Sequence, residues 1–271
     1  MIIKESFVDL QTSQGLMRTF IFQPNLPTFP EAKFPGVVVF AEIYQCTGPI
    51  ERFCRQIASQ GYIVATPESF HEFEPLGSPI PYDVPGTDKG NAYKIQKKLG
   101  AYDEDATVVI DHLMSRADCT GKIGATGICL GGHLAYRAAF DPRVLATVCY
   151  FGTDIHSETL GEGKKSDSLV RTKEIEGEMV MIFGKQDNHV PRWGRDLIRK
   201  TLEDNNVTTT FMEVQAEHAF VRDELSKGRY DAAISKVCFE LLLEVFHRRL
   251  QLDLGPSKGK KVDPASMPLV C

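Results

Sequence analysis

The sequence GICLG occupies residues 127–131, between the apolar run KIGATG (122–127) and the helix-forming segment GGHLAYRAAF (131–140). A sharp turn from a strand into a helix lifts the central side chain away from the backbone, and glycines on either side avoid Cβ clashes. Because a helix begins directly after this turn, free N–H groups favour a thiolate and a developing oxyanion there. The stretch predicts a nucleophilic Cys129, with a buried structural cysteine as the alternative.

Two residues further along the chain support the prediction of a nucleophile. Asp187 follows the apolar run EMVMIF (178–183), and His218 follows the alternating segment TTTFMEVQ (208–215). Each is expected just beyond the carboxyl end of a strand, at the edge where open α/β sheets place their active sites. Alone, such an aspartate is more typical of a turn and such a histidine of a solvated loop. The order cysteine, aspartate, histidine is that of an α/β-hydrolase triad, which we therefore predict.

The composition is typical of one large domain with a full hydrophobic core. The chain has 271 residues, of which 42% are hydrophobic and 25% are charged. Its net charge is -5 and its basic residues are scattered, so we expect no nucleic-acid partner and no membrane binding. The segment MIIKESFVDL is too polar for a signal peptide, so we expect none, and we expect no membrane-spanning segment. Seven cysteines without a C-x-x-C pair favour free thiols and a reducing cytoplasmic location.

Strands and helices alternate along the chain. Continuous apolar runs such as PGVVVFAE are typical of parallel strands that are buried on both faces. The predicted strands are 5–10, 17–23, 36–42, 62–66, 122–127, 144–151, 178–183 and 208–215, and the predicted helices are 49–60, 91–116, 130–140, 191–205 and 229–250. We therefore predict the α/β-hydrolase fold, with a single doubly wound, mostly parallel sheet of about eight strands flanked by helices.

Three segments depart from this alternation. The first two strands alternate in polarity, which predicts an antiparallel hairpin at one edge of the sheet. Residues 67–88 are rich in Pro and Gly and form a long predicted loop near the site. Residues 1–250 are expected to form one domain, and residues 251–271 a loosely ordered tail.

We expect no cofactor and no metal. The segment GEGKKS (161–166) does not have the spacing of a phosphate-binding loop. The segment HEFEP (71–75) lacks the second histidine of a zinc-binding helix.

An acidic residue follows the third predicted strand. In VVVFAEIYQ (37–45), Glu42 comes at the end of a hydrophobic run that is expected in the middle of the sheet. A carboxylate there is costly unless something pairs with it. Glu42 is either a solvated loop acid or a group close to Cys129 that takes the thiol proton.

At these positions the chain resembles the dienelactone hydrolase family, also called carboxymethylenebutenolidases. The matching segments are VFAEIYQ, NAYK (91–94), GICLGG, CYFG (149–152), GKQD and EHAFVR, and the resemblance runs over most of residues 30–248. It implies that Cys129 is the nucleophile, His218 the base, Asp187 the residue that orients the base, and Glu42 the residue that helps to form the thiolate. The resemblance further implies that the backbone N–H groups of Ile43 and Leu130 form the oxyanion hole.

The resemblance also suggests which residues bind substrate. The candidates are Arg222, Lys89, Tyr93, Tyr44 and Phe220. The family binds a carboxylate with two arginines; Arg222 matches one of them, and Lys89 replaces the other with a point charge. Both cations are expected to line the mouth of the pocket, and neither has an evident partner in the sequence, so we expect Arg222, and more weakly Lys89, to select for a substrate carboxylate.

Two positions near the site differ from the family, and four further cysteines and histidines are expected to have no catalytic role. Gln96 stands where the family has a tryptophan, and Glu217 where it has a small residue before the histidine. Cys46 and Cys149 are expected to be buried core residues. His133 and His189 are expected to be solvated or to lie on a helix surface.

The sequence favours a hydrolase that opens an enol-lactone or a small carboxylated ester through an acyl-cysteine intermediate. A general small-ester carboxylesterase is the first alternative. A non-catalytic binding or regulatory protein with the same fold is the second, although it would not need Cys, Asp, His and Glu together. A redox-regulated thiol protein is a third, which the absence of a neighbouring resolving cysteine disfavours. We expect a monomer or a weak homodimer.

Overall fold

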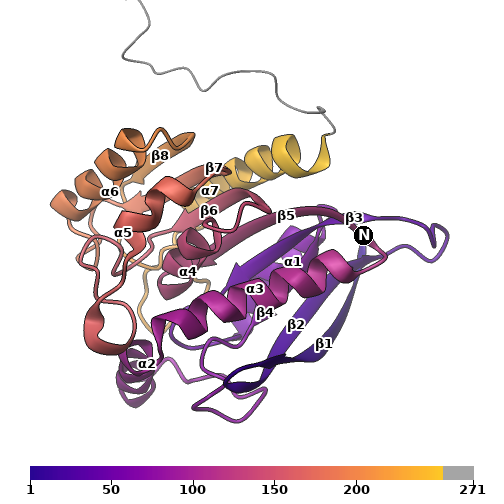
Figure 1. The fold of residues 1–271 in the computed structure, drawn as a ribbon, viewed down its shortest axis with the longest axis horizontal. Coiled ribbons are helices and arrows are strands. Elements are labelled where there is room, and N and C mark those ends of the chain that lie inside the picture. Colours follow the sequence, from indigo (N-terminus) through magenta and orange to yellow (C-terminus); the bar gives the residue numbers. More distant parts are fainter. Residues whose placement is uncertain (253–271) are drawn as a thin grey trace, which may run out of the picture.

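Eight strands form one sheet in the computed structural model, which describes residues 1–252 (Figure 1). In chain order they are β1 (Ile2–Thr12), β2 (Gly15–Asn25), β3 (Phe34–Phe40), β4 (Ile63–Pro67), β5 (Cys119–Ile128), β6 (Val144–Tyr150), β7 (Glu178–Gly184) and β8 (Thr209–Val214). Across the sheet their order is β1-β2-β4-β3-β5-β6-β7-β8. β2 pairs antiparallel with β1 and with β4, and every other neighbouring pair is parallel. The predicted fold class and the antiparallel edge hairpin are confirmed.

Helices of several lengths connect the strands. They are α1 (Gly48–Ala58), α2 (Val84–Gln96), α3 (Leu99–Ser115), α4 (Leu130–Ala138), α5 (Ser168–Arg171), α6 (Arg192–Asp204) and α7 (Ala232–Phe246), with short 3-10 turns at Glu162–Lys164 and Thr172–Glu174 and a π-helical turn at His247–Gln251. No helix within residues 1–252 is both long and apolar enough to cross a membrane. The predicted tail lies outside the described residues, apart from its first two positions.

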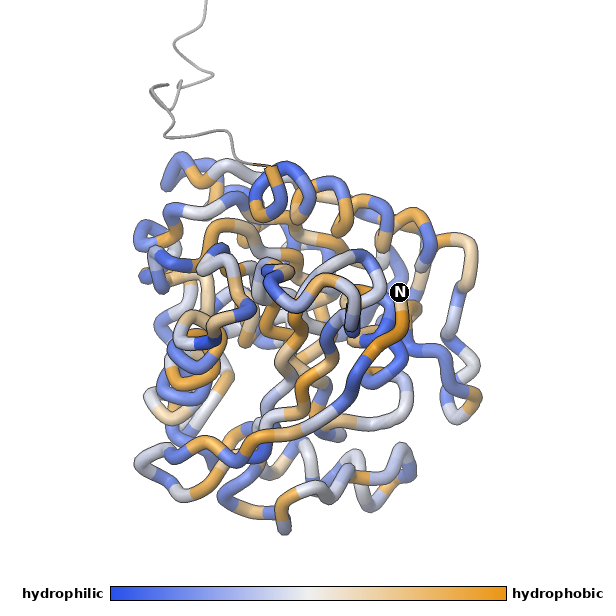
Figure 2. Tube along the Cα trace, turned by 90° about the vertical axis from the view of Figure 1, so that its right-hand side faces the viewer, coloured by the Kyte–Doolittle hydropathy of each residue, from blue (hydrophilic) through white to orange (hydrophobic). Residues whose placement is uncertain are grey.

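Two glycines in the central strands show that helices cover both faces of the sheet. Gly36 on β3 pairs with Ile123 on β5, and a Cβ at Gly36 would lie 3.2 Å from a methyl carbon of Leu113 on α3. Gly124 follows Ile123 and therefore faces the other side of the sheet. A Cβ there would lie 3.2 Å from a ring carbon of Phe246 on α7. Figure 2 shows hydrophobic stretches running through the strands between these layers.

The helix predicted over 91–116 is two helices, α2 and α3, because the chain turns at Lys97. The Lys97 side chain is fully buried, and its ammonium lies 2.7 Å from a carboxylate oxygen of Glu72 and 2.7 Å from one of Asp105. The backbone at Lys97 is extended, and this conformation ends α2. A buried ammonium is stable only when it is paired in this way. The pattern of hydrophobic residues did not reveal the break, since lysine is ordinarily a surface helix former.

The predicted 67–88 loop is shorter than expected, since α2 begins at Val84. Asp83 caps that helix, and its side chain accepts a hydrogen bond from the Gly86 N–H at 2.7 Å. Proline at the start of the helix fits this geometry, because its missing N–H would be unpaired there in any case. The connection between β4 and α2 is therefore residues 68–83.

The parallel strands bring the candidate site together at one edge of the sheet. Strands β3, β5, β6, β7 and β8 run in the same direction, so their carboxyl ends meet there. The residues that follow these five strand ends include Glu42, Cys129, Asp154, Asp187 and His218.

Candidate active site

Cys129 stands at a sharp turn between β5 and α4. Its φ is 61° and its ψ is -119°, a conformation that non-glycine residues rarely adopt. The turn requires glycine on both sides of the cysteine. A Cβ at Gly127 would lie 2.1 Å from the carbonyl oxygen of Gly131, and a Cβ at Gly131 would lie 2.0 Å from that of Phe40. These close approaches position the sulfur above the end of β5.

The backbone around the turn leaves two amides free. The Cys129 N–H donates to the Tyr150 carbonyl at 3.1 Å, which ties the turn to β6. Within residues 1–252, neither the Leu130 N–H nor the Ile43 N–H donates a hydrogen bond. Leu130 is the first residue of α4, where helix N–H groups lack intrahelical acceptors. Both amides are therefore unpaired within the described residues, and their role as an oxyanion hole stays a prediction.

His218 and Asp187 form a buried pair. His218 Nδ1 lies 2.7 Å from Asp187 Oδ2, and the other carboxylate oxygen accepts the His189 N–H at 2.7 Å. Burial would raise the pKa of Asp187, but the hydrogen bond from His218 and the nearby imidazole charge outweigh burial and lower it. The carboxylate is thus fixed and ionised, and it sets the orientation of the imidazole ring.

His218 and Cys129 line the same pocket, and the cysteine influences the charge of the imidazole. The imidazole Nε2 is buried and has no hydrogen-bond partner in the described part of the chain. Burial opposes a charge on the imidazole, but the Cys129 sulfur and Asp187 outweigh burial and raise the pKa of His218 to about 10. Phe151 packs edge-on against the His218 ring, with 4.9 Å between the ring centroids. The ring is held in place by packing and by Asp187, with one nitrogen free for proton transfer.

Glu42 lies in the same pocket, where two side chains hold it. Its side chain is buried, with Oε1 3.1 Å from Arg222 Nη1 and Oε2 accepting the Tyr82 hydroxyl at 3.2 Å. Burial raises the pKa of Glu42, although Arg222, His218 and Tyr82 each oppose the rise. The alternative of a solvated loop acid is wrong, because Glu42 is 1% exposed.

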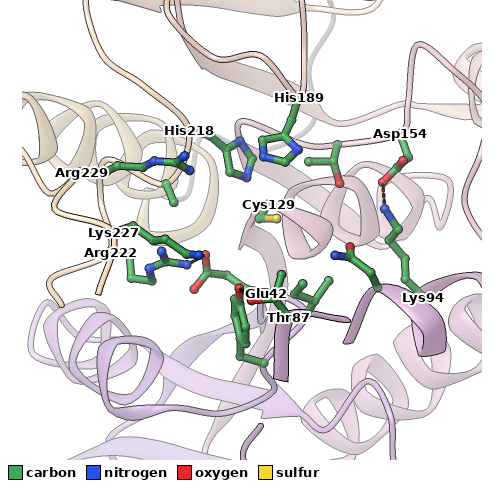
Figure 3. A pocket seen from close by; sticks show the side chains of 15 residues that line it. Glu42, Thr87, Lys94, Cys129, Asp154, His189, His218, Arg222, Lys227 and Arg229 are labelled. Atoms are coloured by element: carbon green, nitrogen blue, oxygen red, sulfur yellow. Dashed lines mark hydrogen bonds and ion pairs between the residues drawn. The ribbon is translucent and has the colours of Figure 1, made fainter. Parts of the chain in front are cut away.

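The pocket around Cys129 is a cavity of about 310 Å³ (Figure 3). Its lining residues are Glu42, Ile43, Tyr44, Thr87, Asn91, Lys94, Cys129, Thr153, Asp154, His189, His218, Ala219, Arg222, Lys227 and Arg229. The prediction included Tyr44 and Arg222 as substrate-binding residues, and both line the cavity. Thr153 and Asp154 were missed, although their place directly after β6 at the same sheet edge was a usable signal.

Three other predicted substrate-binding residues do not line this cavity. Lys89 Nζ lies 2.9 Å from a carboxylate oxygen of Glu74, and the Tyr93 hydroxyl donates to the same carboxylate at 2.8 Å. Phe220 is completely buried. The expectation that Lys89 and Arg222 have no partner in the chain was wrong. Glu74 and Glu42 meet these cations only in the fold, but Arg222 also pairs at 3.0 Å with Glu224, which is two residues away in the sequence.

Most cations of the pocket are paired with carboxylates. Lys94 Nζ lies 2.8 Å from Asp154, and Arg229 lies 3.0 Å from Glu217. Burial opposes a charge on Asp154, yet Lys94 lowers its pKa to about 2. Among the cations that line the cavity, Lys227 alone has no ion pair within residues 1–252. In Figure 3, Lys227 and Arg229 lie on one side of Cys129, and Lys94 and Asp154 lie on the other.

The remaining cysteine and histidine predictions had mixed outcomes. Cys46 and Cys149 are buried core residues, as expected, and burial raises the pKa of each thiol. His133 is not at a surface: it is fully buried, and its Nε2 lies 2.7 Å from the Ser168 hydroxyl. His189 is exposed, as expected, but it lines the cavity and its ring packs against His218 at 4.4 Å.

No group of three or more His, Cys, Asp or Glu side chains within residues 1–252 could hold a metal ion.

Comparisons with known proteins agree with the resemblance inferred from the sequence. A model of the dienelactone hydrolase family matches residues 17–250. A Saccharomyces cerevisiae protein, provisionally named a carboxymethylenebutenolidase, is 52% identical over 262 residues, which are 94% of this chain and 95% of that protein. The carboxymethylenebutenolidase of Pseudomonas putida is 26% identical over 236 residues, or 85% of this chain and 89% of that one.

A solved structure supports the fold independently. A provisionally named dienelactone hydrolase from Klebsiella pneumoniae superposes with a TM-score of 0.77 at 20% identity. The match covers 92% of this chain and 100% of that one. At this identity the similarity concerns the fold alone.

The raised pKa of His218 predicts how stability depends on pH. Because this pKa rises from 6.5 to about 10 on folding, the folded protein holds a proton that the unfolded chain releases between these values. This contribution to stability is complete below pH 6.5 and is lost as the pH rises through about 10. We expect the free energy of unfolding, measured with urea, to fall less over this range in Cys129→Ala, which lacks the sulfur. Parallel curves for the two proteins would contradict this coupling.

Proposed function

This chain belongs to the dienelactone hydrolase family, and we propose that it opens a lactone or a small ester through an acyl-cysteine intermediate. The observation that carries the proposal is that Cys129, on a strained turn, lines the same pocket as His218, which is paired with Asp187 and whose Nε2 has no hydrogen-bond partner in the described residues. A buried structural cysteine would need neither the strained backbone nor the oriented imidazole.

The first half of the reaction transfers the acyl group to sulfur. The Cys129 thiolate attacks the ester carbonyl carbon, and the oxygen that becomes negative is bound by the Ile43 and Leu130 N–H groups. The carbon–oxygen ester bond then breaks, and the leaving oxygen takes a proton from the His218 imidazolium. Opening of a lactone leaves this hydroxyl or enol on the same molecule, because the broken bond was part of the ring.

The second half releases the product. His218 removes a proton from water, and the resulting hydroxide attacks the thioester carbonyl. The carbon–sulfur bond breaks, the carboxylic acid product leaves, and the sulfur returns to thiolate beside the protonated imidazole. Asp187 stabilises that imidazolium throughout through its hydrogen bond to Nδ1.

Glu42 is proposed to assist before the first step. As a buried carboxylate beside the pocket it is a candidate acceptor for the Cys129 proton, which it returns to the sulfur once the product has left. Its partners Arg222 and Tyr82 keep it in place. A thiolate is a better leaving group than an alkoxide or an amine, so the tetrahedral intermediate expels the sulfur again unless the leaving group of the substrate is comparably good. An activated enolate meets this condition, and an amine does not. This argument favours enol-lactones and activated esters over amides as substrates.

The substrate is proposed to carry a carboxylate. The charges of Lys94, Arg222 and Arg229 are engaged by carboxylates of the protein, whereas that of Lys227 is not. Lys227 can therefore bind an anionic group of the substrate without breaking an existing ion pair, whereas the other three cations cannot.

Turnover by the Cys129→Ala variant tests the nucleophile. We expect wild-type protein to hydrolyse members of a panel of enol-lactones and p-nitrophenyl esters, and Cys129→Ala to lose about three or more orders of magnitude in kcat/KM. Equal turnover by the two proteins would exclude Cys129 as the nucleophile. Turnover of the neutral esters alone would favour a general carboxylesterase, and no turnover at all would favour a non-catalytic protein.

Substrate charge tests the role of Lys227. We expect Lys227→Met to lower kcat/KM by roughly tenfold for a carboxylated lactone and to leave neutral esters unchanged, with a smaller effect at high salt. Arg222→Met should instead lower kcat/KM for both substrate classes, because it removes the partner of Glu42. Lys236→Met, an exposed lysine on α7, is the matched control. A Lys227→Met loss of equal size on charged and neutral substrates would contradict this role.

A further inference from the structure

Tyr82 extends from the 68–83 connection into the pocket wall. Its hydroxyl lies 2.6 Å from the Thr47 hydroxyl and donates to Glu42 Oε2 at 3.2 Å. The sequence predicted only that this long connection lies near the site, without a role for any of its residues. These two contacts give the connection a direct link to the carboxylate beside Cys129.

The aromatic ring of Tyr82 is held on two sides. Its centroid lies 4.4 Å from that of Tyr44, and the Arg222 guanidinium carbon lies 4.7 Å from the ring centroid. Arg222 is also the residue that binds the other oxygen of Glu42. The ring and the carboxylate therefore share one cation, which restricts both of them.

The hydrogen bonds around Tyr82 have a fixed direction. An ionised carboxylate is only an acceptor, so the Tyr82 hydroxyl donates its single proton to Glu42. Its oxygen can then only accept from Thr47, whose hydroxyl supplies the donor. The chain Thr47 to Tyr82 to Glu42 thus ends on the carboxylate, and it fits the charged form better than the neutral one.

We propose that Tyr82 is a positioning residue that holds Glu42 ionised and oriented for its exchange with the Cys129 thiol. This inference rests on the proposed function, because it concerns the step in which Glu42 takes the thiol proton. Through the Tyr82 hydroxyl, the 68–83 connection becomes part of the active site.

The charged and titratable groups around Glu42 determine whether loss of the Tyr82 hydroxyl raises or lowers the pKa of Glu42. Arg222 and His218 face it from the segment after β8, and Cys129 faces it from the turn after β5. Lys227 and Tyr44 line the same pocket. Burial raises the pKa of Glu42, and the Tyr82 hydroxyl is among the groups that oppose this rise. Without that hydroxyl, Glu42 would hold its proton to a higher pH.

The test is the Tyr82→Phe variant, which keeps the ring and removes only the hydroxyl. We expect the acid limb of the kcat/KM profile, and that of Cys129 alkylation by iodoacetamide, to move up by about one pH unit. The plateau above that limb should be retained within about twofold, because the nucleophile and the base are unchanged. Thr47→Val removes the donor to Tyr82 and should shift the limb in the same direction by less.

Two further variants make the test specific. Tyr136→Phe removes the hydroxyl of another buried Tyr–Thr pair, which is remote from the pocket, and it should leave both profiles unchanged. In a Glu42→Gln background, Tyr82→Phe should have no further effect, because Tyr82 acts through Glu42.

Three results would overturn the inference: an unshifted acid limb in Tyr82→Phe, a uniform loss at every pH, or an equal loss with and without Glu42. Any of these in a protein that still turns over esters through Cys129 would reject the role of Tyr82 alone. Wild-type protein that hydrolyses none of the esters would instead reject the proposed function, and this inference with it.

Discussion

The close contact of three backbone segments is the constraint on which the site depends. Strand β3, strand β5 and the first turn of α4 approach so closely that a Cβ at Gly131 would lie 2.0 Å from the Phe40 carbonyl oxygen. This contact holds the turn that carries Cys129, and it places the chain after β3 beside the sulfur. Glu42 and the Ile43 amide reach the pocket for the same reason. A larger residue at Gly131 would therefore disturb Cys129, Glu42 and the two unpaired amides of Ile43 and Leu130 together.

Charge pairing then determines which groups are free to react. Asp187 holds one nitrogen of His218, so that the other remains for the thiol. Arg222 and Tyr82 hold Glu42 in place and oppose, without cancelling, the rise in its pKa that burial causes. Each buried charge has a specific partner, and an uncompensated one would be costly. The site is thus an arrangement of paired groups around one sulfur.

Much of this could be predicted from the sequence, because the fold and the residues of the proposed triad leave local signals. Apolar runs reveal the strands, and the residues just beyond their ends include Cys129, Asp187 and His218. The missed features depend on residues far apart in the chain. Lys97 reads as a surface residue until Glu72 and Asp105 are seen to surround it. The pairing of Lys89 with Glu74 likewise cannot be read from composition or periodicity, since it follows from the path of the 68–83 connection.

The most direct measurement of the central claim is the mass of the protein during turnover. Wild-type protein would be mixed with p-nitrophenyl acetate, quenched with acid within the first turnovers, and digested for mass spectrometry. We expect one added acetyl group on the peptide that contains Cys129, and none on that peptide in Cys129→Ala. Steady ester hydrolysis without acylation of Cys129, or with the acetyl group on another residue, would contradict the acyl-cysteine intermediate.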